Sequence, residues 1–337
     1  MADALISPAV GGTMWAASAG LIAYCSKKVR DDVDNIKIPL MGVVGAFIFA
    51  SQMINFTIPG TGSSGHLGGG MILAILLGPY AAFLTMASVL TVQALFFADG
   101  GLLALGCNIF NLGFFPCFIA YPFIYKPIAG ENPSQNRILL GAMTASILGL
   151  QMGAMGVVIE TLFSGISDLH LRTFVLLMQP IHLAIGIVEG LVTAAVVSFV
   201  WKSRPELLQK TANMAHVKGF SPKYVIITLL AAAVITGGVV SWFASSNPDG
   251  LEWAVFHTTG TEELEAPDSN IYSLLAKIQE KTAFLPDYGF RVSENVQANE
   301  PGSESIVNPG TSVSGLVGGS LVLVFAAVIG FALKKRS

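Results

Sequence analysis

Long apolar runs separated by short polar segments dominate the hydrophobic pattern of this chain. A helix that crosses a hydrocarbon core of about 30 Å needs roughly 20 predominantly apolar residues. Several stretches are long enough: 9–26, 38–56, 102–125, 138–164, 174–201, 223–245 and 312–333. The pattern therefore predicts an all-α integral membrane protein with many transmembrane helices.

The region 68–98 is too long for one upright span and short for two. As a single helix it would extend roughly 46 Å at about 1.5 Å per residue. Gly78-Pro79 lies inside it, and proline removes a helical hydrogen bond and disfavours the helical conformation in the residue before it. We expect two short, tilted or discontinuous helices here.

The distribution of basic residues favours two crossings in this region. Cytoplasmic loops of membrane proteins collect Lys and Arg, and the chain has basic clusters at 27–37, 202–223 and 334–336. A single span over 68–98 would put the first two clusters on opposite sides of the membrane, whereas two crossings put all three inside. We therefore predict about nine transmembrane helices in the cell inner (cytoplasmic) membrane, with the N-terminus outside and the C-terminus cytoplasmic.

This topology divides the chain into three regions. Residues 1–201 form a predicted seven-span unit, 202–222 a basic cytoplasmic linker, and 223–337 a two-span unit that encloses an exported segment of about 247–310. The exported segment is acidic, because eleven of the 21 Asp and Glu residues lie between Asp249 and Glu304.

Composition agrees with a lipid-embedded protein and excludes several functions. Hydrophobic residues make up 53% of the chain and charged residues only 12%, about half the charge of a typical soluble domain. Nothing in the charge pattern indicates nucleic-acid binding. The three cysteines show no C-x-x-C spacing, which favours small packing residues over a zinc site. The chain has no phosphate-binding G-x-x-x-x-G-K-[ST] and no H-E-x-x-H, so we expect neither ATP hydrolysis by this chain nor a zinc protease.

The segment 57–70 is the most informative for function, because it places His66 between two groups of glycines in an uncharged, exported loop. Glycine lets the backbone approach a ligand closely, and a neutral imidazole suits nickel, copper, zinc and iron. A lone loop histidine is commonly only a polar surface residue. Its position at the entrance to a broken helix favours metal binding, since irregular backbone at membrane depth is tolerated where it lines a buried site.

A second group of polar residues lies within or beside apolar helices: Gln93, Asp99, Asn108 and Asn111. Polar side chains are costly in lipid and are functional candidates. The alternative is that they bond to one another or to backbone between helices. For Asp99-Gly-Gly101, a tight turn is the favoured interpretation over a direct metal ligand.

Glu160, His182 and Glu189 form a third group in apolar runs. His182 and Glu189 are seven residues apart, so they share one helix face two turns apart. These residues could form an ion pathway or a proton relay. Hydrogen bonding between helices is the interpretation that we favour.

Several motifs in residues 1–200 resemble the CbiM/NikM family, the substrate-capture components of energy-coupling factor (ECF) importers for cobalt and nickel. The matching pieces are Ala2-Asp-Ala-Leu-Ile-Ser-Pro8, Gly65-His66-Leu-Gly-Gly69, Leu77-Gly-Pro-Tyr80, Gln93-Ala-Leu-Phe-Phe-Ala-Asp-Gly-Gly101, Gly106-Cys-Asn-Ile-Phe-Asn-Leu-Gly113 and His182 through Glu189-Gly190. Further along, Asn247-Pro-Asp-Gly-Leu-Glu-Trp253 resembles the PDGLE motif of the small companion subunit. The resemblance implies a NikMN-like fusion of both components, with a seven-helix unit like those of ECF capture components.

The resemblance also implies a ligand set for the metal. In this family the ion is held by the N-terminal amine, by the backbone amide and imidazole of a histidine at position two, and by a histidine in the glycine-rich loop. His66 matches the loop ligand, and Met1 marks the N-terminal region, but Ala2 stands where the second-position histidine is expected. We expect Met-His to precede Met1 in the natural protein, with residues 1–8 folding inward toward His66. Gln93, Asp99, Asn108, Asn111, His182 and Glu189 are then candidates for supporting or pathway roles.

The family implies a transported ligand, Ni²⁺ or Co²⁺, with no resident cofactor, and a division of labour among partners. A CbiQ/NikQ-like transmembrane coupling protein and a CbiO/NikO-like cytosolic ATPase would drive release of the ion inside. Small residues on the first helix, Ala16 and Gly20, could pack against the coupling protein, although internal packing is the favoured interpretation. Two alternatives stay open: a proton-coupled secondary divalent-cation transporter that titrates Glu160, Glu189 or Asp99, and a structural role in assembly.

Overall fold

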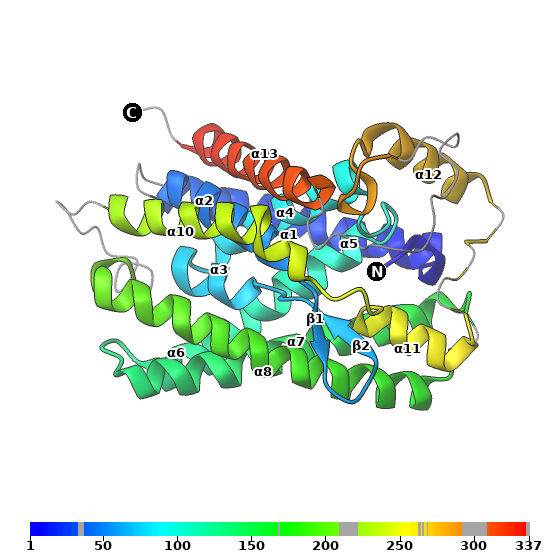
Figure 1. Cartoon of the computed structure of the whole chain (residues 1–337), viewed down its shortest axis with the longest axis horizontal. Helices are drawn as coiled ribbons and strands as arrows, with labels where there is room; N and C mark the ends of the chain where they lie inside the picture. Colours follow the sequence, from blue (N-terminus) through cyan, green and yellow to red (C-terminus); the bar gives the residue numbers. More distant parts are fainter. Residues whose placement is uncertain are drawn as a thin grey trace.

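The computed structural model describes residues 1–32, 37–167, 169–208, 222–261, 264, 266–267, 269–291 and 309–334. Helices dominate this part of the chain, as the hydrophobic pattern predicts. The long helices run roughly side by side along the longest axis of the molecule (Figure 1). In chain order they are α1 (Pro8–Asp32), α2 (Lys37–Gln52), α4 (Pro79–Phe97), α7 (Gln135–Ser164), α8 (Leu171–Ser203), α10 (Lys223–Gly238) and α13 (Pro309–Leu333).

Shorter elements lie between and beyond these helices. They are η1 (Asp3–Leu5), α3 (Gly70–Leu77), α5 (Leu105–Ile109), η2 (Phe110–Tyr125), α6 (Lys126–Ala129), η3 (Val240–Phe243), α11 (Gly250–Thr259), α12 (Asn270–Thr282) and η4 (Pro286–Tyr288). The α5–η2–α6 stretch is continuous, and its central part is a π-helix that contains Pro116 and Pro122. Proline cannot donate a helical hydrogen bond, which fits the wider winding of this segment.

Five described helices are long and apolar enough to cross a membrane: Pro79–Phe97, Leu105–Ala129, Gln135–Ser164, Leu171–Ser203 and Pro309–Leu333. Two shorter helices, Lys37–Gln52 and Lys223–Gly238, are also apolar. The protein is therefore a multi-pass helical membrane protein. The count of nine spans stays a prediction.

The predicted break at Gly78-Pro79 is confirmed. Helix α3 ends at Leu77, α4 begins at Pro79, and Gly78 has a φ of 79°. The eight residues of α3 extend only about 12 Å, less than half of a hydrocarbon core of about 30 Å. The residue Gly68, just before α3, contacts Glu189 near the middle of α8. The segment before α3 is therefore irregular backbone that lies inside the helix bundle.

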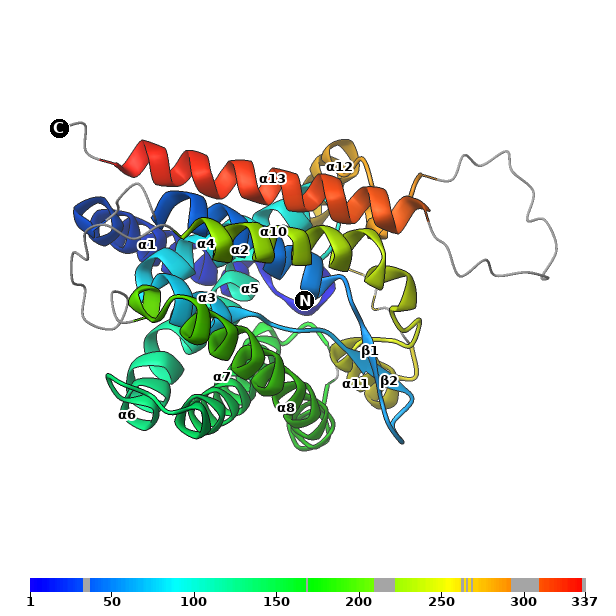
Figure 2. The ribbon, with the colours of Figure 1, turned by 60° about the vertical axis from the view of Figure 1, so that its left-hand side comes forward.

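A small antiparallel hairpin was not expected from the sequence. Strands β1 (Phe56–Ile58) and β2 (Ser63–Gly65) pair with Phe56 opposite Gly65. The hairpin lies beside α11 (Figure 2). His66 follows β2 directly, so the hairpin carries the loop histidine into the protein.

The two long apolar helices of the C-terminal region pack directly on the N-terminal unit. Both α10 and α13 contact α2 and each other. Gly237 and Gly315 meet where α10 and α13 cross, and a β-carbon on Gly315 would lie 2.3 Å from the Gly237 carbonyl oxygen. Small residues at such crossings let helix backbones approach closely in a membrane. The two halves of the chain thus form one helical body.

One packing expectation is wrong. Ala16 and Gly20 on α1 are exposed, and a β-carbon on Gly20 would meet nothing within 4 Å. This face of α1 is therefore not used for packing within the described chain. The helices that surround α1 contact its opposite side, where Ser18 donates to the Gly106 carbonyl.

Candidate functional site

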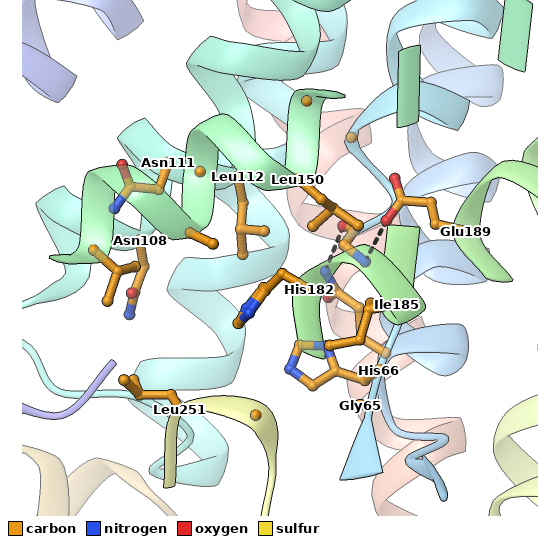
Figure 3. Close-up of a pocket in the computed structure, with 18 of the residues that line it drawn as sticks. Gly65, His66, Asn108, Asn111, Leu112, Leu150, His182, Ile185, Glu189 and Leu251 are labelled. Atoms are coloured by element: carbon orange, nitrogen blue, oxygen red, sulfur yellow. Dashed lines mark hydrogen bonds between the residues drawn. The ribbon is translucent and has the colours of Figure 1, made fainter. Parts of the chain in front are cut away.

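One cavity of about 160 Å³ collects the polar residues that the sequence singles out. It lies among α2, α3, α4, α5, η2, α7, α8 and the start of α11 (Figure 3). The predicted residues that line it are Met1, His66, Gln93, Asp99, Asn108, Asn111, His182 and Glu189. The structure therefore brings together residues that lie far apart in the sequence.

The N-terminal segment folds inward to this cavity. The Met1 carbonyl accepts hydrogen bonds from the Gly101 amide at 3.1 Å and from Asn108 Nδ2 at 3.4 Å. The Asp3 carboxylate accepts from the Ala104 amide at 2.9 Å. Burial raises the pKa of Asp3, and the backbone hydrogen bonds to this carboxylate oppose part of the rise. These contacts fix the beginning of the chain against the segment that follows Asp99.

His66 and His182 present their imidazoles to the same cavity (Figure 3). The Nδ1 atom of His66 lies 3.2 Å from the Leu67 carbonyl, and that of His182 lies 2.8 Å from the Met178 carbonyl. A ring nitrogen that donates to a carbonyl fixes the tautomer and leaves Nε2 with a lone pair. This is the arrangement in which an imidazole can bind a metal ion.

Two of the predicted amide side chains, those of Gln93 and Asn111, are hydrogen-bonded between helices, as the interhelical interpretation predicts. Gln93 Nε2 donates to Gln52 Oε1 at 3.0 Å, and Asn111 Nδ2 donates to Glu160 Oε2 at 2.7 Å. Asn111 Oδ1 is buried without a partner in the described protein. Glu160 itself lies behind Asn111 and does not line the cavity.

Asp99 occupies the tight turn that its glycines predict, since Gly100 has a φ of 78°. Its carboxylate accepts a hydrogen bond from the Tyr288 hydroxyl. Asp99 also lines the cavity, so the turn places a carboxylate at the mouth of the site. Tyr288 lies 189 residues further along the chain and could not be predicted as its partner.

His182 and Glu189 both line the cavity, as their seven-residue spacing predicts. They differ in their partners. His182 bonds within its own helix, whereas Glu189 Oε2 accepts from the Gly68 amide at 2.8 Å. Glu189 is therefore tied to the loop that carries His66.

Sequence reasoning missed several lining residues. Gln52 is a polar residue at the end of an apolar run, and the rule that intramembrane polar groups are functional candidates could have found it. Asp249, Gly250 and Leu251 also line the cavity, although they belong to the PDGLE-like segment. The sequence contains no signal for how this distant segment docks.

The PDGLE-like segment is held on the hairpin by several hydrogen bonds. The Ser64 amide donates to the Pro248 carbonyl at 2.8 Å, and Ser64 Oγ donates to the Asn247 carbonyl at 2.8 Å. Trp253 Nε1 donates to the Thr61 carbonyl at 2.9 Å. Asp249 caps α11 in a reciprocal arrangement with Glu252, a motif that fixes the start of a helix. This segment thus forms one wall of the cavity.

Comparison with known proteins agrees with this arrangement. The CbiM family, described as the cobalt uptake substrate-specific transmembrane region, matches residues 1–207, and the PDGLE domain matches residues 223–335. A putative fused nickel transport protein NikMN of Archaeoglobus fulgidus is 32% identical over 335 residues, which cover 99% of this chain and 97% of that protein.

Two further relatives support the same assignment. The fused nickel transport protein NikMN of Rhodobacter capsulatus is 29% identical and covers 85% of this chain and 87% of its own length. The cobalt transport protein CbiM of Sorangium cellulosum is 30% identical over 57% of this chain and 85% of its own length.

A crystal structure of a transition metal transporter matches with a TM-score of 0.54 and 30% identity, covering 64% of this chain and 98% of the other. These similarities and the cavity assign the chain to the CbiM family of nickel and cobalt transport proteins, fused to a PDGLE domain.

Proposed function

We propose that this chain is the substrate-specific component of an ECF-type ABC importer. It captures Ni²⁺ or Co²⁺ on the exported side and passes the ion inward. The observation that carries the proposal is that His66, Met1 and polar residues of several helices line one cavity. The relatives named for nickel and cobalt transport support the choice of cargo.

The ligand set that fits this cavity is not built from side chains alone. Within the part of the chain that the structure describes, no group of three or more His, Cys, Asp and Glu residues could hold a metal ion. His66 therefore needs donors from the backbone or from the N-terminal segment, and Met1 lies in the same cavity. Nitrogen donors of this kind suit Ni(II) and Co(II), whose selection depends on geometry more than on raw affinity.

The exposed face of α1 supports a membrane partner. Ala16 and Gly20 leave a surface of small residues that no described part of the chain covers. Such faces allow close helix packing between proteins in a membrane. We assign this face to a CbiQ/NikQ-like coupling protein, which connects the chain to a CbiO/NikO-like ATPase in the cytoplasm.

The alternative mechanism, proton-coupled secondary transport, needs a carboxylate that is free to titrate. Each candidate carboxylate already accepts a hydrogen bond: Asp99 from Tyr288, Glu160 from Asn111, and Glu189 from Gly68. These bonds support structural roles for the three carboxylates.

The test is nickel and cobalt uptake into proteoliposomes that contain this chain alone or with its ATPase and coupling protein. The proposal predicts uptake only with the partners and ATP present. Uptake by this chain alone, driven by an imposed pH gradient, would instead establish the secondary transporter.

A further inference from the structure

The backbone of Gly68, two residues beyond His66, is hydrogen-bonded through both its amide and its carbonyl to buried side chains. Its amide donates to Glu189 Oε2 at 2.8 Å, and its carbonyl accepts from Gln52 Nε2 at 2.9 Å. Gln93 Nε2 in turn donates to Gln52 Oε1 at 3.0 Å. The three side chains come from α8, α2 and α4, and each is at most 6% exposed.

Glu189 also acts as a cap for α3 that is supplied by another helix. Gly69 precedes α3 in a left-handed conformation and has no side chain to cap the helix. Beside the Gly68 amide that donates to it, the Glu189 carboxylate has the backbone amides of Gly69 and Met71 close enough to interact with it electrostatically. The first amides of a helix lack partners and form its positive end, which favours an anion there. This explains how a carboxylate is accommodated in the middle of a membrane helix.

The fit between the loop and this carboxylate is close. A β-carbon on Gly68 would lie 3.0 Å from Glu189 Oε2, and one on Gly69 would lie 2.6 Å from Ile48. The backbone of the loop therefore rests directly on α8 and α2. No side chain of the loop itself takes part in these contacts.

We propose that Glu189 and Gln52, supported by Gln93, are positioning residues for metal capture. They hold the backbone that follows His66 at a fixed depth and orientation, so that the imidazole faces the cavity before the ion arrives. None of the three needs to touch the metal. This inference rests on the proposed role of His66 and adds the groups that preorganise it.

The physical reason is that an imidazole on a glycine-rich loop has many accessible orientations. Glycine loses more conformational freedom on ordering than any other residue. A loop that is ordered only by the metal would spend part of its binding free energy on that ordering, whereas a loop that is already fixed would not. Groups that orient a metal ligand typically change affinity roughly tenfold to a hundredfold when removed.

The substitutions that test this weaken or remove one hydrogen bond of Gly68 at a time. Glu189→Gln keeps the shape but removes the negative charge and leaves one acceptor oxygen in place of two, which weakens the hydrogen bond from the Gly68 amide. Gln52→Glu keeps the acceptor for Gln93 but removes the donor to the Gly68 carbonyl. Gln151→Glu is the matched control, since Gln151 Nε2 donates to the Gln179 carbonyl between α7 and α8 and neither residue lines the cavity.

Two measurements on the full chain separate the positioning role from general stability. The first is amide hydrogen exchange of the peptide covering residues 65–71 without metal, which we expect to accelerate in Glu189→Gln and Gln52→Glu but not in Gln151→Glu. The second is the dissociation constant for Ni²⁺ by calorimetry, which we expect to rise roughly tenfold to a hundredfold in the same two variants. Glu189→Asp, which keeps the carboxylate, should show smaller changes in both measurements than Glu189→Gln.

Unchanged exchange in Glu189→Gln and Gln52→Glu would show that these side chains do not hold the loop in place. Faster exchange with wild-type nickel affinity would overturn their role in metal capture. If the chain bound neither ion even with Met-His placed before Met1, the proposed function would fail, and the exchange rates would still decide whether these residues fix the loop. Should Glu189→Gln fail to fold, Gln52→Glu makes the same test from the other side of the peptide.

Discussion

The backbone amide of Ser64 donates a 2.8 Å hydrogen bond to the carbonyl of Pro248, across 184 residues of sequence. Ser64 is fully buried and stands two residues before His66. Pro248 begins the segment that contributes Asp249 and Gly250 to the cavity wall. The PDGLE domain therefore contacts the loop that carries His66 directly and forms part of the cavity wall.

The first prediction concerns the indole of Trp253, which ties the PDGLE domain to the hairpin. Trp253→Phe removes the hydrogen bond to the Thr61 carbonyl and should cost about 1 kcal/mol at the hairpin, so nickel affinity should fall. Trp242→Phe is the control, because its indole bonds to Ser312 between α10 and α13. Calorimetry with Ni²⁺ on both variants checks this, and equal affinities would show that the hairpin contact does not influence capture.

The fold was largely predictable because its signals are local. Apolar runs located the helices, and Gly78-Pro79 located the break between α3 and α4. The position of α3 inside the bundle was not predictable, since a helix of eight residues that follows irregular backbone shows no periodic pattern. The hairpin at 56–65 was also missed, because its strands of three residues are too short to show alternation.

The candidate site was predictable in its members more than in its contacts. Polar residues in apolar helices are costly unless they have partners, and this rule found Gln93, Asn111 and Glu189. Their partners depend on how distant segments pack, so Gln52 and Asp249 were not identified. The same limit explains the wrong expectation for Ala16, since the sequence does not show which face of α1 is left uncovered.

The second prediction separates backbone strain from steric contact in the glycine-rich loop. Gly62 and Gly69 both have a φ of 76°, but a β-carbon on Gly62 would meet nothing within 4 Å, whereas one on Gly69 would lie 2.6 Å from Ile48. Gly62→Ala should lower the free energy of unfolding by about 1–2 kcal/mol, because alanine is strained in the left-handed conformation. Gly69→Ala should lower the free energy of unfolding by about 1–3 kcal/mol more than Gly62→Ala, because its methyl group would also clash with Ile48.

Thermal unfolding of the detergent-solubilised chain measures both losses. Gly69→Ala should have the lower midpoint and should also weaken nickel binding, because the displaced backbone belongs to the loop that carries His66, the proposed metal ligand. Equal midpoints for the two variants would contradict the close packing of Gly69 on α2.

The third prediction addresses the exposed face of α1. Ala16→Leu adds bulk where the described chain makes no contact, so the stability of the isolated chain and its nickel affinity should stay within the small range typical of surface substitutions. Co-purification with the coupling protein should be lost, because a larger side chain keeps the helices apart. Val324→Leu on α13, at another exposed position, should leave the complex intact. Intact complexes for both variants would exclude this face as the contact.

The central claim is that His66 binds the transported ion, and uptake of radiolabelled nickel by cells that express the full transport system tests it most directly. His170→Ala serves as the control, since His170 is exposed just before α8 and does not line the cavity. We expect His66→Ala to reduce uptake to the level of cells without the transporter and His170→Ala to leave it unchanged. Wild-type uptake by His66→Ala, at equal protein levels in the membrane, would contradict the account.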